Sequence, residues 1–406
     1  MPLVTPISAL LPKPDLAAKI CELPYDVMSS EEARVVAAGN PLSFLHVSKP
    51  EIDLPPATDP HDAKVYQQGQ RSFQELIRRG ALIRPPASSF YLYRQQTATH
   101  RQLGLAAAAS CEDYRKGIVK KHELTRPDKE DDRVRHIEAL EAQTGPAFLF
   151  YRADARFDAF LEDFTRRLAP YADFQAADGV RHTSWVLPNE ATSQIKTFFA
   201  QLPCLYIADG HHRSAAAERV ARARPSNSSA AGFLSVIFPD RQLQILSYNR
   251  ALRDLNGNSE LQLLEKLSGI FIVENAGAPQ PVTRHQVGLY LGRRWRTLRF
   301  RPELTAGRDP FETLDVTLLQ KQVLAPLFGI DDPRTSTRVS FVGGIRGTAE
   351  LERLVENGEY ACAFSMFPTS IEELMAIADQ GGIMPPKSTW FEPKLRDGMF
   401  CHFLGP

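Results

Sequence analysis

The sequence predicts an α+β fold, in which strands and helices are mixed without strict alternation. Between residues 90 and 210 strand-like runs are interleaved with helical ones, whereas 233–248 and 286–300 each look like two neighbouring strands. The chain has 406 residues, of which 43% are hydrophobic and 24% charged, which is enough for two or three domains. We expect one region over 1–255 and an α+β C-terminal region over 256–406, because Asn256-Gly257-Asn258 is the strongest boundary signal.

Local signals predict the elements of the first region in order. Two serines and two glutamates from Ser29 onward predict a helix start, and Gly39 ends that helix. Residues 44–47 look like a short strand. Apolar residues at helical spacing predict a helix over 62–79, which Gly80 follows. The same signals predict strands at 90–94, 103–109, 147–151 and 182–187, and helices at 157–168 and 192–199.

The second part of the chain contains two predicted hairpins. One joins 233–238 to 243–248, and the other joins 286–291 to 295–300 around Gly292. Helices are predicted at 313–325, 348–355 and 371–378, with a strand at 360–366. We find no internal repeat and no low-complexity segment.

Composition disfavours several classes of protein. Lys and Arg number 48, as do Asp and Glu, so no net basic field favours a nucleic acid partner. The five cysteines lie far apart without a C-x-x-C pair, which argues against a zinc ribbon or a disulfide framework. Reduced thiols in a cytoplasmic protein fit best. No run of about twenty apolar residues predicts a membrane span, and the first residues lack the pattern of an export signal.

The most informative motif follows the strand-like run 204–208. A strand that turns through glycine into a helix leaves backbone N–H groups and the positive end of the helix dipole at one point, which suits an anion. An arginine at that point adds a fork of donors that matches phosphate or carboxylate. The residues concerned are Asp209, Gly210, His211, His212, Arg213 and Ser214. The alternative is a structural turn in which Asp209 caps the helix and the basic residues face water.

A second candidate lies in 113–136, where more than half of the residues are ionisable. His122 and Glu123 precede a proline and stand at a predicted strand end, where catalytic groups often lie. A glutamate beside cations can stay ionised and act as a general base. The alternative is a solvated helix face, which accounts well for the charges from Lys129 onward.

Other candidates are weaker. Gly343 to Gly347 lacks the ending of a P-loop and is interpreted as a turn. Isolated histidines such as His46 are interpreted as satisfied polar contacts. No H-E-x-x-H motif supports a metal site, although spacing alone leaves one open. Its members would be His122, Glu123, His136, His182, His211 and His212.

Four segments of the sequence together resemble the bacterial family catalogued as domain-of-unknown-function family 1015. The resemblance rests on residues 24–27, 120–133, 207–213 and 385–391, and it spans nearly the whole chain. The family name implies no activity.

A narrower resemblance covers residues 118–218. The pairing of a His-Glu with a later Asp-Gly-His-His-Arg is similar to free L-serine kinases of the ParB/sulfiredoxin-like superfamily. It implies a ParB/sulfiredoxin-like nucleotide-binding core over 1–255, with an N-terminal extension and a large insertion, because the two motifs stand closer together in the small kinases. The turn from Asp209 to Ser214 would hold nucleotide phosphates, and Glu123 with His122 would serve as general base. Further phosphate or substrate contacts would come from Lys120, Lys121, Arg126, Arg133 and Lys387.

The function implied is a nucleotide-dependent phosphotransferase that phosphorylates the hydroxyl of free L-serine or a related small hydroxy amino acid. ADP or ATP would be the phosphate donor, and Asp209 is the nearest acidic residue to hold Mg²⁺. The partners would be a nucleotide and a small molecule, with no nucleic acid or membrane, and a homodimer is compatible with this.

The alternative is a ParB-like switch that binds and hydrolyses a nucleotide, CTP in its relatives, without amino acid kinase activity. A redox role like that of sulfiredoxin is not expected, because position 211 is histidine where that chemistry needs a cysteine.

Overall fold

The computed structural model describes residues 3–306, 309 and 311–405, and the fold is α+β as predicted. The chain divides into two compact units. The first unit contains the chain up to Leu243 and the C-terminal segment from Pro393, and the second is Gln244–Glu392. The predicted division at 255/256 differs from this one, since β14 (Tyr248–Leu252) already belongs to the second unit's sheet. The C-terminal segment returns to the first unit because β21 (Cys401–Phe403) pairs with β2 (Ala9–Pro12).

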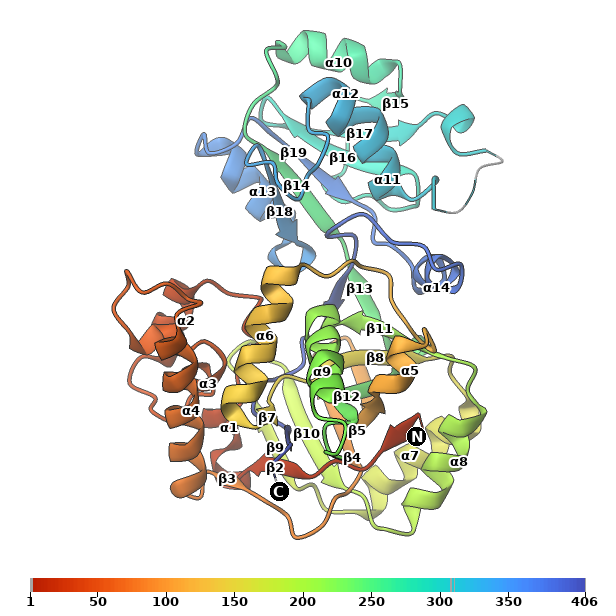
Figure 1. Ribbon diagram of the computed structural model, residues 1–406. Coiled ribbons are helices and arrows are strands. Elements are labelled where there is room, and N and C mark those ends of the chain that lie inside the picture. Colours follow the sequence, from red (N-terminus) through yellow and green to blue (C-terminus); the bar gives the residue numbers. More distant parts are fainter. Residues whose placement is uncertain (1–2, 307–308, 310, 406) are drawn as a thin grey trace. The chain divides into compact units, whose positions relative to one another are not determined.

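Within the described residues, a nine-stranded sheet forms the centre of the first unit (Figure 1). Its order is β6-β11-β8-β12-β5-β4-β10-β9, with β1 paired to β5. The pairs β6/β11 and β8/β12 are parallel and the other pairs are antiparallel. The strands are β1 (Val4–Thr5), β4 (Tyr91–Gln96), β5 (Arg101–Ser110), β6 (Val119–Lys120), β8 (Ala147–Tyr151), β9 (Ala172–Gln175), β10 (Arg181–Val186), β11 (Leu205–Asp209) and β12 (Gly232–Pro239).

Two helices of the first unit, α6 (Pro127–Leu140) and α9 (His211–Ala223), run side by side, and α9 packs on β8 and β12 (Figure 1). A small sheet of order β3-β2-β21-β7 stands apart from the large one. The remaining elements are η1 (Pro14–Leu16), α1 (Ala17–Ile20), α2 (Ser30–Ala37), α3 (Leu45–Ser48), η2 (Pro50–Asp53), α4 (Ala63–Arg78), β3 (Leu82–Ile83), α5 (Cys111–Arg115), β7 (Ala142–Gln143), α7 (Ala155–Arg167), α8 (Ala191–Gln201) and η3 (Asp240–Gln242).

The sheet is packed tightly at its centre. All eight residues of β12 are buried, as expected for a strand covered on both faces. Opposite it on β5, a Cβ added to Gly104 would lie 2.7 Å from side-chain carbons of Val236 and of Phe238. Close approach between the strands therefore requires glycine at position 104.

Most predicted elements of the first unit are confirmed. The helix at Ser29 begins with a capping box to Glu32, and the 62–79 helix is α4, capped by Asp62. The strand predicted at 44–47 is wrong: these residues enter α3, whose first turn Ser43 supports by accepting a hydrogen bond from the Leu45 N–H. The 233–248 hairpin is also wrong, because β5 and β8 occupy both edges of β12 and leave none for the following segment.

The second unit contains a six-stranded antiparallel sheet of order β15-β17-β16-β19-β14-β18. The predicted hairpin at 286–300 is confirmed as β16/β17, with Gly292 and Arg293 at positive φ in the turn. The segment at 244 forms β13 and pairs with β20 instead of β12. The elements are β13 (Gln244–Leu246), α10 (Glu260–Ser268), β15 (Phe271–Glu274), β16 (Gln286–Leu291), β17 (Arg294–Phe300), η4 (Pro302–Leu304), α11 (Asp315–Leu319), a π-helical turn (Gln320–Leu324), α12 (Ala325–Phe328), β18 (Val339–Gly343), η6 (Gly344–Arg346), α13 (Gly347–Glu356), β19 (Cys362–Met366), α14 (Ile371–Asp379) and β20 (Trp390–Glu392).

All five cysteines are free thiols and buried. In the part of the chain that the structure describes, no helix combines the length and apolar character needed to cross a bilayer.

Candidate functional site

The parallel pairing of β6 with β11 brings the two sequence motifs together. Leu205 lies opposite Val119 and Tyr206 opposite Lys120, so both strands end at the same edge of the sheet. The chain continues from β6 into His122 and Glu123, and from β11 through Gly210 into α9. Residues that are 89 positions apart, such as His122 and His211, therefore come into contact.

The turn at Gly210 leaves the start of α9 uncapped. Gly210 adopts φ 90° and ψ 32°, and a Cβ there would lie 3.2 Å from the Ala147 Cα and the Arg213 Cζ, so glycine is required. Among the described residues no side chain caps this helix, since Asp209 Oδ1 accepts a hydrogen bond from the Gly210 N–H at 2.8 Å instead. The alternative in which Asp209 is the cap is wrong. The first N–H groups of α9 remain available to an anion.

Two buried, neutral imidazoles adjoin this turn. The rings of His122 and His211 meet edge to face, with centroids 4.5 Å apart. Burial lowers the pKa of His122 to about 4 against the opposing charge of Asp209. Burial and the neighbouring His122 lower the pKa of His211 well below its ordinary value. Positive charge at this edge therefore comes from the helix terminus and from lysine and arginine.

A hydrogen bond to one nitrogen of the His211 ring leaves the ring proton on the other nitrogen, which faces Glu123. The backbone N–H of His122 donates to His211 Nε2 at 3.5 Å, which places the proton of the neutral ring on Nδ1. That nitrogen lies 3.9 Å from Glu123 Oε2. The Glu123 side chain is 43% exposed and His211 only 4% exposed, so the carboxylate is held near a buried donor while remaining accessible to a substrate. His122 Nδ1 is buried and, within the described residues, has no hydrogen-bond partner.

Asp209 belongs to a cluster of opposite charges. Its Oδ2 lies 2.8 Å from Lys394 Nζ, and its Oδ1 lies 3.8 Å from Arg213 Nη2. Burial alone would raise the pKa of Asp209, but Lys394 and Arg213 outweigh it and hold the pKa below its ordinary value. Arg213 Nη2 also faces Asp26 Oδ2 at 3.5 Å, and Nη1 donates to the Pro146 carbonyl at 2.5 Å.

This cluster bears on the predicted magnesium ligand. Both oxygens of Asp209 already face cations or an N–H donor, so a metal bound directly would have to displace Lys394. Over the described ranges, no three His, Cys, Asp or Glu side chains gather in a group able to hold a metal ion. The geometry does not fit a magnesium site built on Asp209, and no chemical step is derived through the metal.

The other basic residues near the turn are held by local contacts. His212 Nε2 accepts a hydrogen bond from the Arg126 N–H at 3.1 Å, which joins α9 to the loop after Glu123. Lys121 Nζ lies 3.9 Å from the ring centroid of Tyr114, and burial lowers the pKa of Lys121. Lys120 Nζ lies 5.9 Å from the ring centroid of Tyr206 on β11. The exposed Arg126 side chain pairs with Asp128, and among the described residues no side chain caps α6.

Three further predicted contacts have other partners in the structure. Ser214 is fully buried and donates its hydroxyl to the Gly210 carbonyl at 3.1 Å, so it stabilises the turn and does not face a phosphate. Arg133 is almost wholly buried, with its Cζ 3.9 Å from the ring centroid of Tyr25. Lys387 belongs to the second unit, where its Nζ lies over the ring of Tyr248.

Sequence reasoning missed the acidic and basic partners of Arg213 and Asp209. Lys394 reaches Asp209 across 185 positions, and Asp26 comes from the N-terminal segment. Asp26 stands in the segment 24–27 that contributes to the family resemblance, which was the one available signal. Lys394 has no local signal.

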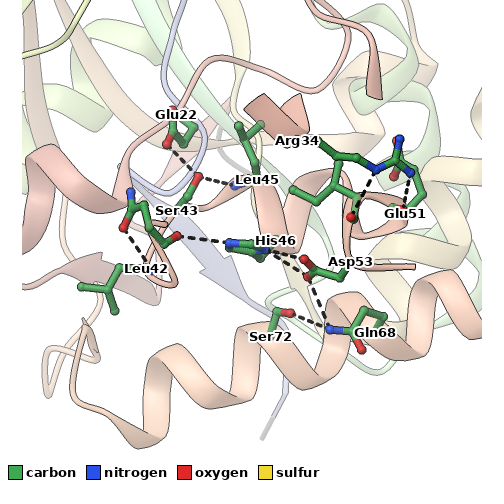
Figure 2. A network of polar contacts seen from close by, with 12 residues as sticks. Glu22, Arg34, Leu42, Ser43, Leu45, His46, Glu51, Asp53, Gln68 and Ser72 are labelled. Atoms are coloured by element: carbon green, nitrogen blue, oxygen red, sulfur yellow. Dashed lines mark hydrogen bonds and ion pairs between the residues drawn. The ribbon is translucent and has the colours of Figure 1, made fainter. Parts of the chain in front are cut away.

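A separate polar network surrounds His46 (Figure 2). His46 Nδ1 lies 2.8 and 3.0 Å from the two carboxylate oxygens of Asp53, and Nε2 lies 3.1 Å from the Asn40 carbonyl. The hydrogen bond to Asp53 raises the pKa of His46. The expectation that His46 is a satisfied polar contact is confirmed, and the network fixes the loop that leads into α3 and η2.

Comparison with known proteins gives one family and several distant structures. The family described as "Protein of unknown function (DUF1015)" matches residues 4–317. No curated protein matches the sequence.

The similar solved structures share little sequence with this chain. A conserved hypothetical protein from Pyrococcus furiosus is 16% identical with a TM-score of 0.36, over 72% of this chain and 93% of that one. C-terminally truncated SbnI from Staphylococcus aureus is 11% identical with a TM-score of 0.39, over 72% and 85%. A free serine kinase in complex with AMP is 15% identical with a TM-score of 0.35, over 76% and 91%. At these values the three structures carry no argument about chemistry.

Proposed function

This chain belongs to the DUF1015 family, and we propose that it is a nucleotide-dependent phosphotransferase acting on the hydroxyl of free L-serine or a related small hydroxy amino acid. One observation carries the proposal. The parallel pairing of β6 with β11 puts the Glu123 carboxylate beside the uncapped N-terminus of α9, with Glu123 Oε2 3.9 Å from His211 Nδ1. A base and an anion site thus stand at one sheet edge.

The start of α9 is suited to nucleotide phosphates. Its N–H groups and helix dipole attract negative charge, and Gly210 allows close approach because it carries no side chain. Lys120, the last residue of β6, and Lys121 directly after it precede His122 and add positive charge at the same edge. The neutral imidazoles of His122 and His211 add hydrogen-bonding groups without adding charge.

Glu123 is the residue suited to act on the acceptor. The acceptor hydroxyl would attack the terminal phosphorus of ADP or ATP, forming an oxygen–phosphorus bond while the bond from that phosphorus to the bridging oxygen breaks. Glu123 would take the hydroxyl proton, and the nucleotide would leave with the electron pair of the broken bond. His211, whose ring proton faces Glu123, would position the carboxylate.

A base on one side and a phosphate-binding helix terminus on the other agree with what phosphoryl transfer generally requires. The protein mainly positions the reactants and stabilises charge, so one base and a set of N–H donors are nearly sufficient. Mg²⁺ would accompany the nucleotide and offset part of its phosphate charge, without Asp209 as a ligand.

Purified protein tests the proposal directly. The protein is incubated with Mg²⁺, ADP or ATP and each of L-serine, L-threonine and L-homoserine, and the phosphorylated amino acid is detected by mass spectrometry. We expect phosphoserine with at least one nucleotide. Nucleotide binding with no phosphorylated product for any of the three acceptors would instead favour the nucleotide-dependent switch.

A further inference from the structure

Beneath the start of α9, the first unit contains a small cavity rich in charged groups. Its volume is about 30 Å³, and its lining includes Tyr25, Ser48, Arg133, Arg213 and Asp397. A single water needs roughly 10–15 Å³ by the same measure, so the cavity holds about two water-sized groups. It is too small for a nucleotide.

Two guanidinium groups line the cavity, and each also faces acidic side chains, Arg133 that of Asp132 and Arg213 those of Asp26 and Asp209. Arg213 has a 9% exposed side chain and Arg133 a 12% exposed one, so both are largely withdrawn from water. Arg133 is oriented by Asp132 at 2.6 Å and by the ring of Tyr25. Guanidinium groups in such positions bind carboxylates strongly, because water does not screen the interaction.

Unsatisfied polar atoms indicate that a ligand belongs there. Ser48 is 3% exposed, and its Oγ has no hydrogen-bond partner among the described residues. Arg213 Nε also has no hydrogen-bond partner among the described residues, although the other two nitrogens of that side chain have partners. Buried polar groups are normally paired, so two orphans on residues of one cavity call for an explanation.

The surrounding structure fixes the walls of this cavity. His136, which also lines it, lies with Nε2 2.8 Å from the Val47 carbonyl and so holds the α3 turn that carries Ser48. Glu22 accepts a hydrogen bond from Ser43 at 2.7 Å in the network around His46 (Figure 2). The backbone of Glu22 pairs in both directions with that of Asp397. The loop network of Figure 2 thus supports two walls of one site.

Asp397 adds an acidic group to the cationic pair. It is 2% exposed, and its Oδ1 lies 2.8 Å from where a Cβ on Gly145 would stand, so only glycine fits at position 145. Burial raises the pKa of Asp397 to about 7 against the opposing charges of Arg213 and Arg133. A small cation beside this carboxyl group would keep it ionised. Two guanidinium groups with one carboxylate complement a molecule that carries both charges.

We propose that this cavity binds the head group of a free α-amino acid, with its carboxylate between Arg133 and Arg213 and its ammonium toward Asp397. The inference rests on the proposed function in that the bound amino acid is the phosphate acceptor. Arg213 belongs both to the cavity and to the charge cluster of Asp209, so it joins the head-group site to the first turn of α9.

Binding measurements on the full-length protein test this without requiring turnover. Calorimetry and thermal shift are run with L-serine, L-alanine, L-serine methyl ester, N-acetyl-L-serine and acetate. L-serine and L-alanine should both bind and raise the melting temperature. The ester lacks the carboxylate and the N-acetyl compound lacks the ammonium, so both should bind at least about tenfold more weakly.

Variants locate the binding in this cavity. Arg133→Gln should weaken L-serine binding about a hundredfold, and Ser48→Ala about tenfold, because one removes a buried charge and the other a single hydroxyl donor. Ser48→Ala leaves no other group unpaired and should fold normally. Arg135→Gln is the matched control: it lies on the same helix but is exposed, and should bind like the wild type.

The outcomes separate the two proposals. Binding of L-alanine without any phosphotransfer to L-serine would support the amino acid site and contradict the proposed kinase activity. Phosphoserine formation with unchanged L-serine binding in Arg133→Gln and Ser48→Ala would support the kinase and overturn this site. Equal affinity for acetate and L-serine, or for the ester and L-serine, would also overturn it.

Discussion

Replacing Asp209 with asparagine should destabilise the first unit markedly. The substitution removes the charge that Lys394 Nζ faces at 2.8 Å and Arg213 Nη2 at 3.8 Å. The Lys394 side chain is only 10% exposed, so water cannot replace the lost carboxylate. The variant therefore tests whether the buried charge cluster maintains the turn before α9.

The expected magnitude follows from the geometry. At an effective dielectric constant of 20, a pair at this separation interacts by about 6 kcal/mol before the cost of desolvation is subtracted. Breaking a buried pair costs about 3–5 kcal/mol, and since the Asp209 side chain is 29% exposed we expect about 3 kcal/mol. With an m value of about 2 kcal/mol per molar urea, the midpoint should fall by about 1.5 M.

The direction of the pKa shift of Asp209 determines how the stability of the first unit depends on pH. The pKa of Asp209 lies below its ordinary value, so its contribution is present above that value and is lost as pH falls through the folded-state pKa. At pH 7 the full difference between wild type and Asp209→Asn should be measured.

Urea unfolding followed by tryptophan fluorescence is the assay. In a Trp295→Phe/Trp390→Phe background, the buried Trp185 reports on the first unit alone. Asp15→Asn, which breaks an exposed ion pair with Lys13, is the control and should shift the free energy of unfolding by less than about 1 kcal/mol.

A double-mutant cycle completes this test. Asp209→Asn/Lys394→Gln should be less destabilised than the sum of the two single variants, because neither buried charge is then left alone. The reasoning would be refuted if Asp209→Asn lowered the free energy of unfolding by less than about 0.5 kcal/mol. It would also be refuted if the destabilisation of the double variant equalled the sum of those of the two single variants.

The remaining predictions concern the turn, the sheet and the histidines. Gly210→Ala should lower stability by about 1–3 kcal/mol and weaken nucleotide binding, since alanine at φ 90° is strained and its Cβ would lie 3.2 Å from Ala147; a urea titration with calorimetry checks both. Gly104→Ala should cost about 1–3 kcal/mol by overpacking β12 while leaving nucleotide affinity unchanged, and a variant as stable as the wild type would contradict the packing. The pKa of His122 is lowered to about 4, so the unfolded chain binds more protons between that value and 6.5, and the stability that neutral His122 contributes should decline as pH falls through this window. His122→Gln should flatten the decline, and an unchanged slope in urea titrations at pH 4.5 to 7 would contradict it.

Local chemistry made the two motifs of the site predictable. A strand, a glycine and a helix start within a few residues already predict a helix N-terminus at Gly210, with a cap by Asp209 left open, and a His-Glu at a strand end predicts a polar edge. The resemblance added that the motifs belong together. The structure supplies the reason, which is the parallel pairing of two residues in β6 with β11.

Contacts between residues far apart in the sequence could not be predicted from local patterns. Arg133 looks like part of a solvated helix in the sequence, but its guanidinium lies against the ring of Tyr25, which is distant in sequence. Lys394 reaches Asp209 only because the C-terminal segment returns to the first unit. At residues 44–47 the apolar run Phe44, Leu45 and Val47 fits a buried strand or a buried helical turn equally well, and tertiary packing chose the helix.

Phosphoryl transfer by Glu123→Gln, compared with wild type, tests the central claim most directly. Transfer of labelled phosphate from the nucleotide to L-serine is followed alongside nucleotide binding by calorimetry. Loss of the proposed general base should slow transfer about 10²- to 10⁴-fold while nucleotide affinity stays within about twofold, because the proposal has Glu123 contact the acceptor and the helix terminus bind the phosphates. Transfer at the wild-type rate in Glu123→Gln would contradict the assignment.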